Sequence, residues 1–139
     1  MKTKFTPLLS IKKNELKKSE LALSRANIDL QKATKKLEDS YKELEELPSV
    51  LKGSVSDLLK SRMLLEVAQD VISKNKESIN FAKNQVLLAK DKLQKDTQEF
   101  EKFSYLEAQE IKKALDEQKK LEAKNLDEVA LLKYKGKKL

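Results

Sequence analysis

Residues 16–44 read LKKSELALSRANIDLQKATKKLEDSYKEL, and every seventh residue of this stretch, from Leu16 to Leu44, is a leucine. The same spacing starts at Leu9 and carries on through Leu51 and Leu58 to Phe100 without a polar residue. A helix with an apolar residue at every seventh position presents one continuous seam, and such seams pack against another helix. The stretch therefore predicts a coiled coil.

A second seam row, three residues after the first, is made mostly of small side chains. It contains Ser19, Ala26, Ala33 and Ser40 in the first half of the chain, and Ser61, Ala68, Asn75, Ala82 and Ala89 in the second. If the chain folds back on itself, the large row of each half faces the small row of the other, which fills a core without strain. Because Asn75 is polar, it lowers stability in such a seam and helps to fix the register.

The pairing register is open to slips of one heptad, because each slip keeps large residues opposite small ones. We expect Leu37 to face Ala68, since that register is centred on the internal helix breakers Pro48 and Gly53. The two slipped registers place Leu37 opposite Ser61 or Asn75. One uninterrupted helix in a parallel dimer is a further alternative, which Pro48 disfavours because proline breaks or kinks a helix.

The predicted fold class is all-α, an antiparallel two-helix coiled-coil hairpin with a long C-terminal helix that overhangs the pair. We expect one domain, 1–139, with a helix at 7–47 that starts at an N-cap on Thr6, a turn at 48–54 and a helix at 55–135. The Ser54–Asp57 spacing is that of a capping box and opens the second helix. Beyond Phe103 the apolar residues change phase to Ala108, Ile111 and Leu115, so pairing should end near 93–100. A rival layout folds 48–73 into short tip helices.

The composition argues against catalysis and against binding of metals or cofactors. Charged residues make up 38% of 139, there are 2 Gly and 2 Pro, and there is no His or Cys. This composition is typical of long helices, and it lacks the commonest general base and any glycine-rich phosphate loop. We expect no enzyme activity, no catalytic, cofactor-binding or metal-binding residues, no cofactor and no small-molecule substrate.

The charge pattern and hydropathy bear on partners and location. The net charge is +7, but its sign alternates along the chain, which weakens a nucleic-acid reading. No apolar run approaches the roughly 20 residues that span a bilayer, so we expect a cytosolic protein. One set of apolar residues lies off the seam and predicts a docking patch or a dimer contact: Tyr41, Leu59, Met63, Leu64, Val67 and Val71.

Both ends of the chain resemble the flagellar FliJ family. The likeness rests on Phe5-Thr6-Pro7-Leu8-Leu9 at the start and on Leu126-Asp127-Glu128-Val129-Ala130-Leu131-Leu132-Lys133-Tyr134 at the end. The resemblance implies a component of the flagellar type III export apparatus, shaped like the rotor stalk of rotary ATP synthases. It implies three partners: a hexameric export ATPase, a membrane export gate protein and export chaperones. It also implies a location in the cytoplasm, peripheral to the inner face of the cell membrane.

By position, the resemblance assigns the ATPase contact to the C-terminal motif: Leu126, Asp127, Glu128, Ala130, Lys133 and Tyr134. For the gate and the chaperones we expect the off-seam residues Tyr41, Met63, Leu64, Val67 and Val71. Two other functions stay open. One is a general coiled-coil adaptor or chaperone that self-associates through the second helix, and the other is a salt-sensitive binder of nucleic acid or anionic membrane.

Overall fold

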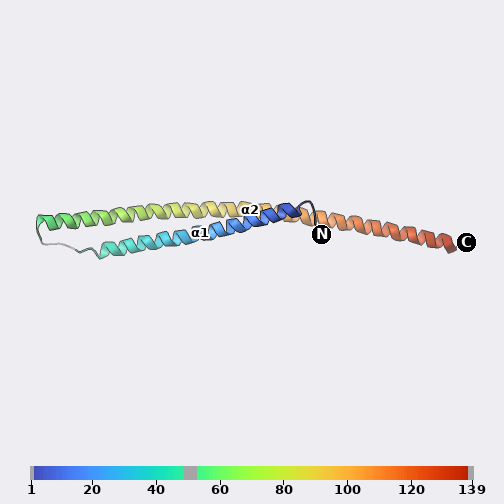
Figure 1. Ribbon diagram of the computed structural model, residues 1–139, viewed down its shortest axis with the longest axis horizontal. Helices are drawn as coiled ribbons and strands as arrows, with labels where there is room; N and C mark the ends of the chain where they lie inside the picture. Colours follow the sequence, from blue (N-terminus) through green and yellow to red (C-terminus); the bar gives the residue numbers. More distant parts are fainter. Residues whose placement is uncertain (1, 49–52, 138–139) are drawn as a thin grey trace. The chain divides into compact units, whose positions relative to one another are not determined.

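The computed structural model describes residues 2–48 and 53–137, which form two helices, α1 (Thr6–Glu45) and α2 (Val55–Lys137) (Figure 1). The chain divides into two compact units, each with a part of both helices. We call them the central unit (Lys17–Lys95) and the terminal unit (Met1–Leu16 with Asp96–Leu139). Neither described helix is long and apolar enough to cross a membrane.

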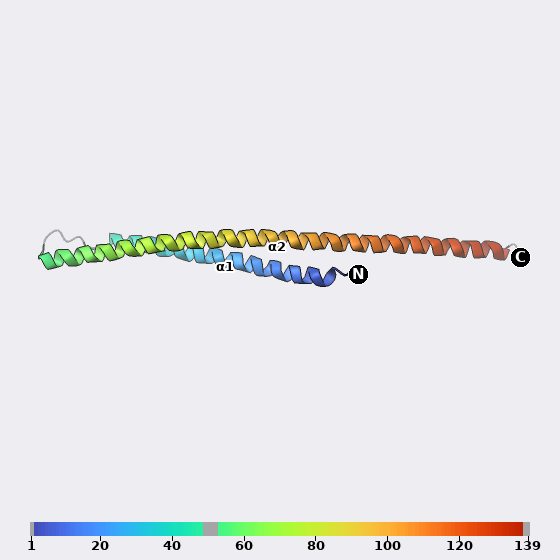
Figure 2. The same ribbon diagram turned by 90° about the horizontal axis from the view of Figure 1, so that it is seen from above.

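In the central unit, α1 and α2 lie side by side and run in opposite directions (Figures 1 and 2). The residues buried between them are Ser19, Ala26 and Ser40 of α1 and Ile72, Ala82 and Val86 of α2. All six belong to the two predicted seam rows. Ser40 can be buried because its hydroxyl keeps a hydrogen-bond partner: it donates to the Leu37 carbonyl at 2.7 Å. The predicted antiparallel hairpin is confirmed, and the single long helix is wrong.

The register differs from the favoured one by one heptad. The Asn75 side-chain amide donates to the Lys36 carbonyl at 3.3 Å, so Leu37 faces Asn75 and not Ala68. This is one of the two slipped registers that the sequence left open. The loop need not lie at the midpoint of the paired residues, and centring the register on Pro48 and Gly53 assumed that it does.

The slip leaves the start of α2 without a helical partner, because α1 already ends at Glu45. The predicted seam residues Leu58 and Leu65 are consequently 46% and 41% exposed. Leu51 and most of the predicted turn fall on 49–52, outside the described residues. The rival layout with short tip helices is wrong, because α2 is continuous from Val55.

The start of α2 confirms the predicted capping box. The Asp57 amide donates to the Ser54 hydroxyl at 3.2 Å, and the Ser54 amide donates to the Asp57 carboxylate at 3.3 Å. This reciprocal pair satisfies two backbone donors that have no partner within the helix. At the start of α1 the prediction is one residue late: Thr6 is the first helical residue, and its hydroxyl accepts from the Thr3 amide at 2.9 Å.

In the terminal unit, pairing extends further along α2 than predicted. The rings of Phe5 and Phe103 lie 6.4 Å apart, and the Thr6 hydroxyl donates to the Glu107 carboxylate at 3.4 Å. Of the three residues expected to mark a change of phase beyond Phe103, Ile111 is half-buried, but Ala108 is exposed and Leu115 is 45% exposed, while Glu107 stays half-buried on the earlier phase. The one-heptad slip accounts for this difference, because it moves the end of pairing from about 100 to about 107.

Candidate protein-binding surfaces

The C-terminal part of α2 is a single helix with exposed apolar side chains. Past Glu107 it continues to Lys137, and every described side chain from 115 to 135 is exposed. Leu126 is 70% exposed and Leu132 is 69% exposed. Large apolar side chains this open on a helix without a partner are typical of an interaction surface.

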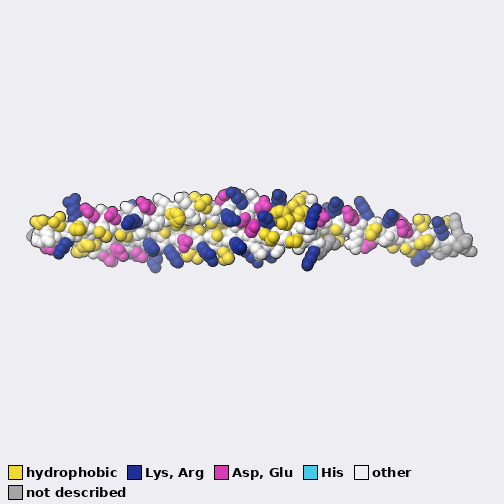
Figure 3. Space-filling model, turned by 45° about the horizontal axis from the view of Figure 1, so that its top comes forward, with side chains coloured by type: hydrophobic (Ala, Val, Ile, Leu, Met, Phe, Trp, Pro, Cys, Tyr) yellow, Lys and Arg dark blue, Asp and Glu magenta, His cyan; other side chains and the backbone are white. Residues whose placement is uncertain are grey.

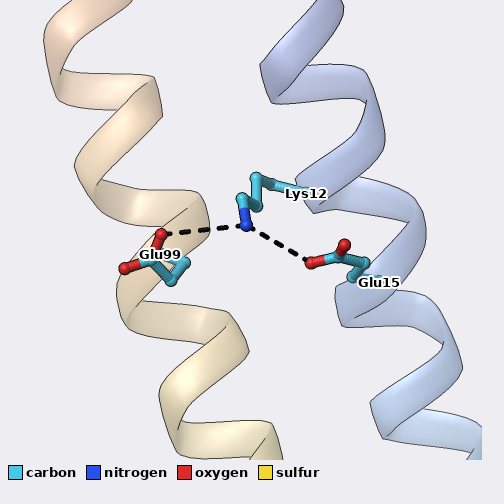
Figure 4. A network of polar contacts seen from close by, with 3 residues as sticks. All are labelled: Lys12, Glu15 and Glu99. Carbon is cyan, nitrogen blue, oxygen red and sulfur yellow. Dashed lines mark ion pairs between the residues drawn. The ribbon is translucent and has the colours of Figure 1, made fainter.

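Polar contacts mark the point where α1 stops covering α2. The Lys12 ammonium lies 3.5 Å from the Glu15 carboxylate on its own helix and 3.8 Å from the Glu99 carboxylate on α2 (Figure 4). The same ammonium lies 5.8 Å from the centre of the Phe103 ring. One oxygen of Glu107 is buried without a hydrogen-bond partner. The last turns of the pair are therefore held by charged and aromatic contacts in place of the small-and-large core of the central unit.

The residues assigned to the ATPase contact do not all share one face of α2. Positions four, seven and eight residues apart project from the same side of a helix. By this spacing Leu126, Ala130, Lys133 and Tyr134 form one face, and Asp127 borders it. Glu128 lies two residues after Leu126, which places it on the opposite side.

The residues assigned to the gate and chaperones are exposed but fall into two groups. Four of them lie on α2, with exposures of 64% for Met63, 51% for Leu64, 60% for Val67 and 40% for Val71. Tyr41 is elsewhere: its ring centre lies 6.0 Å from the Lys76 ammonium. On α2, Lys76 flanks the seam on the edge opposite to Leu64 and Val71. The structure thus gathers the four α2 residues into one patch and separates Tyr41 from it.

Sequence reasoning missed two exposed apolar residues of α2, Phe81 and Leu88, which are 66% and 63% exposed. Both line a groove between the helices of the central unit. The sequence feature that could have revealed them is a shared heptad position outside the seam. This position is occupied in turn by Lys74, Phe81, Leu88 and Lys95. The register decides which α1 residues face them, and the sequence alone left that open.

Comparison with known proteins gives one family. The sequence profile described as "Flagellar FliJ protein" matches residues 1–139. Among solved structures, the chain is similar to a protein named as a YscO homolog from Chlamydia trachomatis, with a TM-score of 0.47 and 24% identity over 97% of this chain and 96% of that one. No curated protein matches the chain.

Proposed function

Since the chain belongs to the FliJ family of non-enzymatic type III export components, we propose that it is a coiled-coil stalk of the flagellar export apparatus. In this proposal the end of α2 binds the hexameric export ATPase ring. The central unit connects to the membrane export gate and to export chaperones. The protein would then reside in the cytoplasm, peripheral to the membrane through the apparatus that it joins.

The single observation that supports the ATPase contact is the exposed helix past Glu107. In proteins, most of the stability of a helix comes from packing its apolar face against a partner, and this helix carries leucines that are 69% and 70% exposed. Enclosure by a ring of subunits would remove these leucines from water and stabilise the helix. The face formed by Leu126, Ala130, Lys133 and Tyr134 offers apolar area beside a cation and a phenol, a combination common at the centre of protein interfaces.

The α2 patch of Met63, Leu64, Val67 and Val71 supports the gate and chaperone contacts. These residues recur at spacings of three and four on one side of the helix, which is how an amphipathic helix presents itself to a partner. All four are at least 40% exposed. We assign Tyr41 to a separate contact on the other edge of the central unit.

The test is stimulation of the purified export ATPase and co-sedimentation with its hexamer. We expect the full chain to do both, and Leu126→Ala with Tyr134→Ala to lose at least about tenfold in apparent affinity, as expected for two interface anchors. The matched control is Leu121→Ala with Tyr105→Ala, since these residues are 60% and 62% exposed on α2 and lie outside the C-terminal motif. Equal behaviour of the two double variants would refute the site assignment.

A second candidate function is an adaptor that self-associates through α2. The observation that favours it is the exposure of Leu64, Val67 and Val71, which a second copy could cover. Sedimentation equilibrium separates the two functions. A monomer mass at every concentration argues against self-association, and a dimer that Val67→Ser dissociates supports it.

A further inference from the structure

A groove between α1 and α2 of the central unit has no role in the stalk proposal. It has a volume of about 480 Å³ and is lined on one side by Ala22, Arg25 and Asp29, and on the other by Phe81, Gln85 and Leu88. We call it the Phe81 groove. Its floor is formed by small side chains, including the buried Ala26. The rings and methyl groups of Phe81 and Leu88 are two-thirds open to solvent, so the groove is apolar and uncovered.

Basic residues border the Phe81 groove along both helices. On α1, Lys18, Arg25 and Lys32 follow at a spacing of seven and share one side of the helix. On α2, Lys74 and Lys95 occupy the same heptad position as Phe81 and Leu88 and bracket them. All five cations are exposed, and Lys95 is paired with Asp91 at 3.2 Å. Among the described residues, the charged ones that line the groove itself are Arg25, Lys92 and Asp29. Cations therefore outnumber acids along the borders of this recess.

We propose that the Phe81 groove binds an acidic amphipathic helix of a partner protein. Its apolar stripe packs on Phe81 and Leu88, which are about 10.5 Å apart along α2, and its carboxylates lie beside Arg25 and Lys32. A third helix in the groove of a two-helix coiled coil buries both apolar residues with the geometry by which helices normally pack.

The shape and chemistry of the groove select this occupant over other anions. A groove is concave, so it fits a convex helix better than a flat bilayer. Phosphates of a nucleic acid would use the cations but leave Phe81 and Leu88 in water. Charge complementarity supplies specificity and fast association, and the apolar residues supply most of the affinity.

The probe is a labelled helical peptide of about three heptads, with leucine on one stripe and glutamate on both flanks. The control peptide has lysine in place of each glutamate. Binding to the full chain is followed by fluorescence anisotropy. We expect the acidic peptide to bind at least about tenfold more tightly than the basic peptide. Its affinity should fall as salt is raised, because the ion pairs are solvent-exposed.

The decisive comparison is Leu88→Ser against Leu87→Ser. Both leucines are 63% exposed and adjacent on α2, but only Leu88 lines the groove. We expect Leu88→Ser to lower the affinity for the acidic peptide by about tenfold, and Leu87→Ser to leave that affinity unchanged. On the charged side, Arg25→Glu should abolish binding, whereas Lys35→Glu on the outer face of α1 should have a small effect.

Three results would overturn the proposal. The first is equal loss in Leu88→Ser and Leu87→Ser, and the second is equal binding of the acidic and basic peptides. The third is that the chain does not bind the acidic peptide but binds vesicles of anionic phospholipid, and that Leu88→Ser weakens this vesicle binding. The ATPase assay does not enter this test, so failure here leaves the stalk proposal intact.

Discussion

A swap of side-chain size across the central unit tests the register directly. In the observed register Ala26 faces Val86, and both are buried, at 9% and 6% exposure. Exchanging them, Ala26→Val with Val86→Ala, moves two carbon atoms from one helix to the other and keeps the volume of the layer. In the register centred on the turn, Ala26 would instead face Ile79. Ala26→Val can therefore be combined with Val86→Ala or with Ile79→Ala, and each combination tests one of the two registers.

The expected magnitudes follow from packing. Val86→Ala removes two buried carbons at about 0.8 kcal/mol each and leaves a small cavity, so it should cost about 2 kcal/mol. Ala26→Val overfills the same layer and should cost about 1–3 kcal/mol, of which about 0.5 kcal/mol is helix propensity. The double variant restores the volume and should lie within about 1 kcal/mol of the wild type, which is a coupling energy of at least about 2 kcal/mol.

The assay is urea unfolding followed by circular dichroism, with the free energy of unfolding taken at a common slope. The control is Ala26→Val with Ile79→Ala. Because Ile79 lies one heptad from the facing layer, about 10.5 Å along the helix, its effect should add to that of Ala26→Val. Additive energies for the Val86 pair, together with coupling for the Ile79 pair, would show that the observed register is wrong.

Three further predictions concern single side chains. Ser54→Ala removes the capping box and should lower the free energy of unfolding by about 1 kcal/mol, while Ser56→Ala, which has no part in the cap, should not. Asn75→Leu should raise the urea midpoint because it replaces a polar seam residue, and it should broaden the distance distribution between paired spin labels because it weakens the register. Phe5→Ala removes the ring contact with Phe103, so hydrogen exchange should accelerate over the first turns of α1 and stay unchanged in the central unit.

The helices and their seam rows followed from the sequence because they depend on local order. The spacing of the leucines sets which side of each helix is buried, and the Ser54–Asp57 pair sets where α2 begins. The register did not follow, because a slip of one heptad keeps nearly every large residue opposite a small one. The hydrogen bond of Asn75 distinguishes the registers, but its acceptor is the backbone carbonyl of Lys36. Since every residue has such a carbonyl, the sequence does not indicate which one Asn75 bonds.

The candidate sites were predictable to a lesser degree than the fold. A helical spacing indicates which residues of one helix share a face, and Met63, Leu64, Val67 and Val71 are exposed on one side of α2. It cannot indicate which residues of two helices share a surface, and for this reason Tyr41 was grouped with a patch on the opposite edge. The Phe81 groove was missed for the same reason, since half of its lining comes from α1.

The register also decides the chemistry of the surface, which connects the swap experiment to the binding experiment. In the observed register, Ala22 and Arg25 lie across from Phe81 and Leu88. A slip of one heptad would put Glu15 where Ala22 lies and Lys18 where Arg25 lies. A carboxylate would then fill a groove that now has a small apolar residue, and it would repel an acidic helix. Both signs of charge are mixed on the face shown in Figure 3, so the pairing of these particular heptads decides whether a carboxylate lies in the recess. A variant that keeps the hairpin but shifts its register should therefore lose the acidic peptide while keeping its helix content.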